Sequence, residues 1–183
     1  TPAIVESIRA GLVFNLQQQV GTDEIERREN DFYRRALARW QASDNIEILG
    51  NPDVPRLSIV SFQIQHQDKY LHYGFVVALL NDLFGIQSRG GCSCAGPYGH
   101  SLLGMDMAYS KALEAEMAKD QMVLRPGWIR LNFNYFIDEE TFEFIVRAVE
   151  LVAEHGWRLQ PYYHFDPAIG TWSYQKRRPD LAV

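Results

Sequence analysis

The chain has 183 residues, and 46% of them are hydrophobic, so it can bury a core as one domain or as one domain with an appendage. Its net charge of −5 argues against a nucleic-acid partner, and the one basic run, at 176–178, is expected to be a solvated tail. Two neighbouring cysteines, no signal peptide and no bilayer-length apolar run favour a cytoplasmic protein without a membrane partner.

The first predicted element is a helix over residues 1–21. Thr1 is its expected N-cap, Pro2 occupies the first helical position and Gly21 ends it. One stripe of this helix is apolar, at Val5, Ile8, Leu12 and Leu16. Because the chain begins at Thr1 rather than at a methionine, we expect a fragment or a processed product.

The next elements alternate between helices and strands. Thr22 is expected to cap a long second helix, with an apolar stripe at Ile25, Phe32, Ala36 and Trp40. Residues 45–50 and 56–65 are predicted to form two strands joined by a hairpin-like connection. An apolar helix over 71–85 should end at Gly85, and residues 86–89 should form a short strand that leads into a cysteine-containing loop.

The second half repeats this alternation. A charged amphipathic helix is predicted over 106–121, a strand over 127–135, and a helix that Asp138 caps and Gly156 ends. Its inward positions are Phe142, Ile145, Val149 and Val152. Residues 157–183 are expected to form an aromatic, proline-containing extension with a strand near 170–174. This order predicts a small α+β fold, a mainly antiparallel sheet with helices on one face.

The loop "SRGGCSCAGPYGH", residues 88–100, holds both cysteines of the chain. Zinc could use Cys92, Cys94 and His100, but a structural site normally needs a fourth ligand, and we expect no metal. One or both cysteines could instead be small apolar fillers beside glycines. A third reading is a nucleophile, because Arg89 can favour the thiolate of an accessible thiol. The common nucleotide, zinc-protease and hydrolase motifs are absent from the sequence.

A family resemblance favours the nucleophile. "RGGCSC" fits the R-x-G-x-x-C pattern around the active cysteine of one group of cysteine desulfurases, which belong to the class V aminotransferase family of fold-type I pyridoxal-phosphate enzymes. The first residues resemble the family's Gly-Thr-Pro segment and helix, and "IRLNFNYFIDEETFEFIVRAVELV" resembles its substrate-arginine strand and last helix. The stretch "GCSCAGPYGHSLLGM" is also similar to the sulfurase domain of molybdenum-cofactor sulfurases.

The resemblance implies roles for four residues. Cys94 matches the persulfide-forming cysteine, which would attack the sulfur of the substrate. Arg130 matches the arginine that pairs with the substrate carboxylate, although from its residue type alone it could equally be an arginine at a strand edge. Arg89 would shape the same carboxylate end, and Thr1 would reach the cofactor phosphate of the neighbouring subunit. The implied partners are an amino acid, a second subunit of a homodimer and a sulfur-accepting protein.

Two departures from the family limit these implications. No lysine of the chain has the family's histidine-lysine context, so we expect the C-terminal part of an enzyme: residues 1–21 from the end of the large domain, a small α+β domain over 22–156 and the extension over 157–183. Such a piece should neither bind pyridoxal phosphate tightly nor turn over alone, and an absorbance band of an internal aldimine would refute this.

The stretch 95–127 is also longer than in compact desulfurases and is a candidate to reposition the loop or cover the site. Two alternatives remain open, a transaminase or lyase with a bystander cysteine, and a non-enzymatic binding or dimerisation module.

Overall fold

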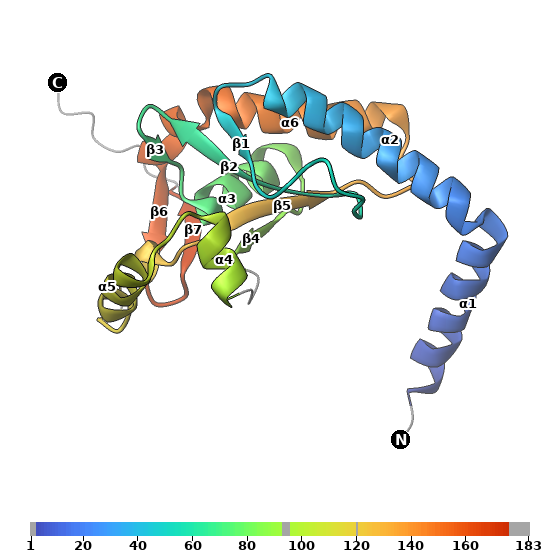
Figure 1. Cartoon of the computed structure of the whole chain (residues 1–183), viewed down its shortest axis with the longest axis horizontal. Helices are drawn as coiled ribbons and strands as arrows, with labels where there is room; N and C mark the ends of the chain where they lie inside the picture. The colour runs from blue at the N-terminus through green and yellow to red at the C-terminus, as the bar shows by residue number, and fades with distance from the viewer. Residues whose placement is uncertain (1–2, 93–95, 120, 176–183) are drawn as a thin grey trace.

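The computed structural model describes residues 3–92, 96–119 and 121–175. Figure 1 shows a sheet with helices packed along it and one helix that projects away at the N-terminal end. The helices are α1 (Ile4–Val20), α2 (Thr22–Gln41), α3 (Tyr73–Phe84), α4 (Gly96–Leu102), α5 (Met107–Met117) and α6 (Glu139–His155), with short 3-10 helices η1 (Met122–Leu124) and η2 (Gly156–Tyr162). The strands are β1 (Ile46–Ile48), β2 (Ile59–His66), β3 (Lys69–Tyr70), β4 (Arg89–Gly91), β5 (Trp128–Asn132), β6 (Tyr163–Asp166) and β7 (Thr171–Tyr174).

The main sheet has the order β1, β2, β5, β4, and every pair in it is antiparallel. Strand β3 also pairs with β2, through Gln65 and His66, beyond the stretch that β5 occupies. Strands β6 and β7 form a separate antiparallel hairpin. Strand β4 pairs with β5 alone, so it lies at one end of the sheet.

One face of the sheet carries the core. Residues Val60, Phe62 and Ile64 of β2 alternate with more exposed neighbours and are buried against α2, α3 and α6. Trp40 of α2 is fully buried, 5.3 Å from the Phe62 ring centroid, and its indole N–H donates to the Val146 carbonyl at 3.3 Å. The predicted α+β fold, a mainly antiparallel sheet with helices on one face, is therefore confirmed.

Several element boundaries differ from the sequence predictions. The first helix begins at Ile4 with Ala3 at the N-cap position, and Thr22 is the first residue of α2 rather than its cap. The predicted strand over 86–89 was misplaced, because β4 spans Arg89–Gly91. The sequence analysis did not anticipate the short helix α4. Gly156 follows α6 as predicted, but its φ of −56° lets the chain continue into η2.

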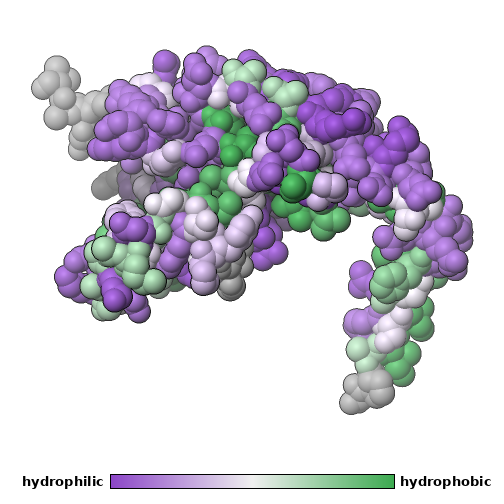
Figure 2. Space-filling model, in the orientation of Figure 1, coloured by the Kyte–Doolittle hydropathy of each residue, from purple (hydrophilic) through white to green (hydrophobic). Residues whose placement is uncertain are grey.

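Helix α1 buries none of its side chains within the described part of the chain. Its apolar residues are largely exposed, and Phe14, for example, is 69% exposed. Figure 2 shows these hydrophobic side chains gathered on the projecting helix. Within the described residues, no helix is both long and apolar enough to cross a bilayer. The assignment of residues 1–21 to a larger neighbouring domain stays a prediction, and Thr1 lies outside the described residues.

The C-terminal hairpin is attached to the N-terminus of α3 through His72. The Nδ1 atom of His72 accepts hydrogen bonds from the Gly74 backbone N–H and from the Trp172 indole N–H, both at 3.0 Å. Burial lowers the pKa of His72, so the imidazole is held neutral. The strand that was predicted near 170–174 is confirmed as β7, paired with β6.

This arrangement predicts that the protein loses stability on mild acidification. The unfolded chain takes up a proton on His72 below its ordinary pKa of about 6.5, whereas the folded chain resists it. The contribution of His72 is therefore complete above about pH 6.5 and is lost as the pH falls from there toward the lowered pKa of the folded protein. We expect the free energy of unfolding, measured with urea, to decrease over this window. His72→Asn keeps an N-cap acceptor and should flatten the dependence. An equal slope in both proteins would contradict the prediction.

Candidate functional site

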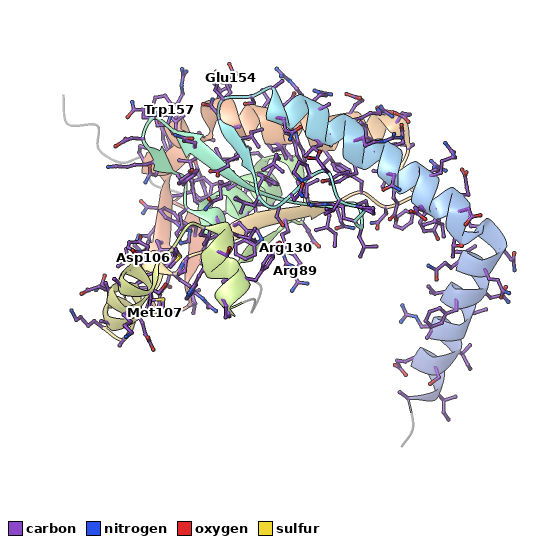
Figure 3. All side chains as sticks on the ribbon, viewed as in Figure 1. Arg89, Asp106, Met107, Arg130, Glu154 and Trp157 are labelled. Atoms are coloured by element: carbon purple, nitrogen blue, oxygen red, sulfur yellow. The ribbon has the colours of Figure 1, made fainter. Side chains whose placement is uncertain are left out.

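The two arginines that the sequence singled out lie directly opposite each other on the sheet. Arg89 of β4 pairs with Arg130 of β5, and Ser61 of β2 continues the same row on the other side of β5. Opposite residues of an antiparallel pair project from the same face, and this face is the one turned away from the helical core. Figure 3 shows the two arginines on neighbouring strands.

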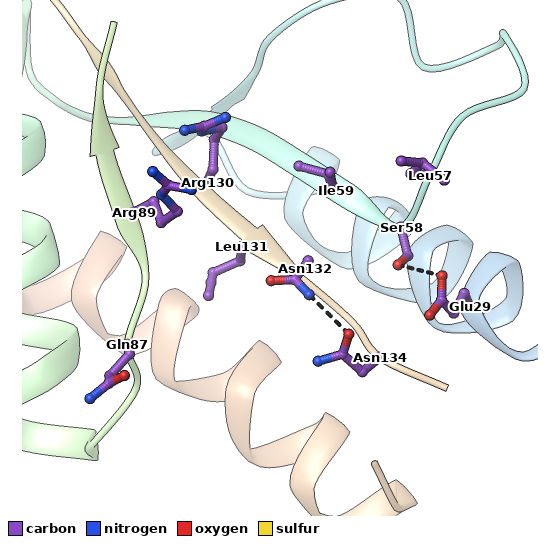
Figure 4. Close-up of a pocket in the computed structure, with 10 residues that line it drawn as sticks. All are labelled: Glu29, Leu57, Ser58, Ile59, Gln87, Arg89, Arg130, Leu131, Asn132 and Asn134. Carbon is purple, nitrogen blue, oxygen red and sulfur yellow. Dashed lines mark hydrogen bonds between the residues drawn. The ribbon is translucent and has the colours of Figure 1, made fainter. Parts of the chain in front are cut away.

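The arginines line a hollow of about 310 Å³ on this open face. Figure 4 shows the hollow, which extends along β5 from Arg130 past Asn132 to Asn134. The Asn132 side-chain N–H donates to the Asn134 carboxamide oxygen at 3.1 Å. The sequence analysis missed both asparagines, although "RLNFN" places polar side chains at every second position of a strand. That alternation was the signal that could have found them.

Glu29 of α2 lines the other end of the same hollow. Its carboxylate accepts a hydrogen bond from the Tyr135 backbone N–H at 3.2 Å, and the Ser58 hydroxyl lies 3.1 Å away. Glu29 thus connects α2 to the start of β2 and to the chain just after β5. No local sequence pattern indicates Glu29, because its partners are distant along the chain.

The charge pattern of the hollow fits an anionic group. Within the described residues, neither Arg89 nor Arg130 donates a side-chain hydrogen bond or forms an ion pair, although each guanidinium group carries five N–H donors. Like charges directly opposite each other in a sheet are unfavourable. A carboxylate between the two guanidinium groups would relieve this repulsion and accept bidentate hydrogen bonds. The opposite carboxylate, Glu29, suits a cationic group of the same ligand.

A close approach of backbones fixes the position of β4. Gly127, which is buried just before β5, has no room for a side chain. A Cβ atom there would lie 2.7 Å from the Gly91 Cα and 2.7 Å from the Tyr73 ring. The same ring would meet a Cβ on Gly90 at 2.8 Å. Strand β4 and the start of β5 therefore approach each other backbone to backbone, and the Tyr73 ring at the start of α3 packs directly on both.

We expect Gly127→Ala to destabilise the fold and to displace β4. Either the Gly91 backbone or the Tyr73 ring must move, and overpacking of this kind costs about 1–3 kcal/mol. The matched control is Gly11→Ala on α1, where no atom lies within 4 Å of the new Cβ and alanine favours the helix. The midpoint of urea denaturation should be lower for Gly127→Ala than for the wild type. The midpoint for Gly11→Ala should not be lowered. Equal midpoints in the two variants would count against the close approach.

The chain leaves β4 directly into the cysteine loop. Gly91 has a φ of 123°, and Cys92 follows it half-buried. Burial, and to a lesser extent the neighbouring Cys92, raise the pKa of the Tyr73 hydroxyl. Cys94, the predicted nucleophile, lies outside the described residues, as does the whole of 93–95. Helix α4 then returns over the sheet, where the Cβ position of Gly99 is 3.5 Å from the Trp128 ring.

The expectation of no metal at the loop stays a prediction, because Cys94 lies outside the described residues. His100 of α4 has Nδ1 3.2 Å from the Ser110 hydroxyl of α5, which gives this histidine a structural partner. No cluster of three or more potential metal ligands occurs among the described residues, a set that leaves out Cys94.

The described residues also do not supply the anchor of a pyridoxal cofactor. Lys69 lies in β3, Lys111 in α5, and Lys119 pairs with Glu116 at 2.7 Å, so none of them lines the hollow. Lys176 lies outside the described residues. The hollow therefore offers paired guanidinium groups to an anionic group but, among the described residues, no lysine to the aldehyde of the cofactor.

Comparison with known proteins shows the family of the chain. A probable cysteine desulfurase of Halobacterium salinarum is 28% identical over 105 residues, which cover 57% of this chain and 24% of that protein. The aligned part thus spans about a quarter of the length of this relative. The family model described as aminotransferase class-V matches residues 1–135, which include both arginines and the cysteine loop. The chain therefore belongs to the class V aminotransferase family.

Proposed function

We propose that this chain provides the substrate-carboxylate subsite and the sulfur-accepting loop of a pyridoxal-phosphate-dependent cysteine desulfurase. The pairing of Arg89 with Arg130 carries this proposal, because it places two unpartnered cations of the described chain on one strand pair that leads straight into the loop of Cys94. The desulfurase-like relative and a family whose members generally use pyridoxal phosphate support it.

In this proposal Arg130 and Arg89 hold the carboxylate of cysteine, so that its side-chain sulfur lies at the loop. The Cys94 thiolate attacks that sulfur, an S–S bond forms, and the C–S bond breaks. The electron pair of the broken bond stays on the former β-carbon, which takes up a proton. Cysteine thus becomes alanine, and the enzyme thiol becomes a persulfide, without any external oxidant or reductant.

The cofactor in this proposal is held by parts of the enzyme other than the described residues. Bound pyridoxal phosphate supplies the electron sink that weakens bonds to the amino-acid carbons. The chain alone is therefore expected to lack the activity. The homodimer, the role of Thr1 at the neighbouring cofactor and the sulfur-accepting protein belong to this proposal as well.

Product analysis of the full-length protein tests the proposal. With cysteine as substrate, we expect alanine in the supernatant and a protein mass increase of one sulfur atom on the peptide that contains Cys94. A class V transaminase that uses the same arginines for another amino acid is the second candidate, because a carboxylate subsite serves both reactions. Keto-acid formation without alanine or persulfide would establish that second candidate and refute the desulfurase.

A further inference from the structure

We propose that the outer edge of β4 is a docking site for an extended, lysine-containing segment of the protein that accepts sulfur from the loop. The identity of this partner rests on the proposed function, whereas the docking geometry rests on the sheet. β-Strand addition is a common way for a domain to bind an extended peptide, because main-chain hydrogen bonds provide affinity and neighbouring pockets provide specificity.

The register of the sheet shows which backbone groups face outward. The Phe133 N–H donates to the Ser58 carbonyl at 3.1 Å, so these two residues form a hydrogen-bonded pair between β2 and the end of β5. Such pairs alternate along an antiparallel ladder, and Arg130 therefore directs its backbone N–H and C=O toward β4 rather than β2. Arg89, opposite Arg130, is hydrogen-bonded to β5, and the alternation leaves the N–H and C=O of Gly90 on the outer edge.

The backbone of Gly90 is available at this edge. Gly90 is exposed, and no backbone hydrogen bond outside the strand ladders reaches it within the described residues. Beside it, the Ser88 hydroxyl oxygen is buried and has no hydrogen-bond partner in the described chain. A buried polar atom without a partner is costly, and a main-chain group of an added strand would satisfy it.

The edge borders a hollow of about 560 Å³. Tyr73, Val77 and Asn81 of α3 form one wall, and Thr171 and Trp172 of the C-terminal hairpin form another. Because β4 is only three residues long, one outward residue offers few hydrogen bonds, and the side-chain contacts of this hollow must supply the rest of the affinity. An extended segment fits this combination better than a helix, which has no free main-chain groups along its length.

The charge of the hollow indicates the partner's side chain. Asp82 is the single charged residue among those that line it, and it is exposed. Its carboxylate accepts a hydrogen bond from the Tyr163 hydroxyl at 3.0 Å, which orients it without neutralising it. A lysine of the added strand would complement Asp82 at this place.

The position of the edge connects docking with chemistry. Cys92 directly follows β4, and Cys94 is two residues further along the chain, so a segment added along β4 brings its own neighbouring residues to the end of the strand where the loop begins. A thiolate of that segment would attack the outer sulfur of the Cys94 persulfide. The new S–S bond forms as the old one breaks, and Cys94 leaves as a thiolate, so the transfer needs no further redox partner.

Binding of a designed peptide to the full-length protein tests the docking site without any turnover. The probe is a fluorescein-labelled peptide of alternating valine and threonine with one central lysine. In one version of the peptide, the main-chain N–H groups that point to one side of the extended chain are methylated. In a second version, those that point to the other side are methylated. Fluorescence polarisation should show that one version binds about tenfold more weakly per lost hydrogen bond, while the other binds like the parent. Hydrogen exchange followed by mass spectrometry should show slower exchange in the segment that contains Ser88 and Gly90.

The outcomes separate this proposal from the proposed function. Asp82→Asn, which keeps an acceptor for Tyr163, should weaken the lysine peptide severalfold but leave a norleucine version unchanged. Equal binding of both N-methylated peptides, or unaltered exchange at Gly90, would overturn the docking site even if cysteine is still converted to alanine. If exchange at Gly90 slows when the protein concentration alone is raised, without peptide, a second copy of the chain is the occupant of the edge. That result would also overturn the proposal. Peptide binding without any desulfurase activity would retain the edge as a docking site and remove the sulfur acceptor as its partner.

Discussion

Cys94→Ser in the full-length protein is expected to abolish alanine and persulfide formation from cysteine. A serine hydroxyl is not ionised near neutral pH and cannot take over a sulfur atom, whereas a cysteine thiolate can. Cys92→Ser is the matched control, two positions away in the same loop. Because Cys92 is half-buried and its carbonyl lies near helix α4, we expect this variant to lose some stability but to retain the reaction.

The measurement must follow the cofactor as well as the products. If Cys94→Ser retains the absorbance of bound pyridoxal phosphate and yet releases no alanine, the loss is chemical rather than a failure to fold. Turnover of cysteine to alanine at the wild-type rate in Cys94→Ser would reduce Cys94 to a bystander. Loss of activity in Cys92→Ser with normal activity in Cys94→Ser would show that the assignment of the two cysteines is reversed.

Local sequence signals predicted most helices well because capping and periodicity act over a few residues. Asp138 accepts the Thr141 N–H at 2.8 Å as the expected N-cap of α6, and Gly85 ends α3 in the left-handed conformation. The prediction placed strand β4 too early along the chain. The stretch "IQSR" is apolar enough for a strand, but the position of a strand is decided by the residues with which it pairs in the sheet. The partner residues, Trp128 to Arg130, lie about forty residues away along the chain.

The candidate site was predictable only in part, for the same reason. The family motif identified Arg89 and Arg130, and the structure brings them opposite each other. Glu29 could not be found, because its contact with the Tyr135 backbone depends on how α2 crosses the sheet. The free edge of β4 was equally hidden, since it follows from the strand order and from the hydrogen-bond register rather than from any residue type.

Arg130→Met in the full-length protein is expected to reduce kcat/KM for cysteine more than a hundredfold, because removing one partner of a hydrogen-bonded charge pair costs about 3 kcal/mol. The loss should appear mainly as a higher KM. Arg130→Lys should restore only part of it, since an ammonium group cannot form the bidentate contact. Arg89→Met should have a smaller effect, because Arg89 is the more exposed of the two.

Stability provides the contrasting measurement for the same variant. Arg130 makes no side-chain hydrogen bond or ion pair within the described residues and faces Arg89 across the ladder, so Arg130→Met should leave the urea midpoint unchanged or raise it at low salt. An arginine that served only the sheet would behave in the opposite way. Its removal would lower the midpoint and leave KM unchanged, and that pattern would remove Arg130 from the site. A higher midpoint together with a higher KM is the combination expected of a cation that is held in place for a ligand.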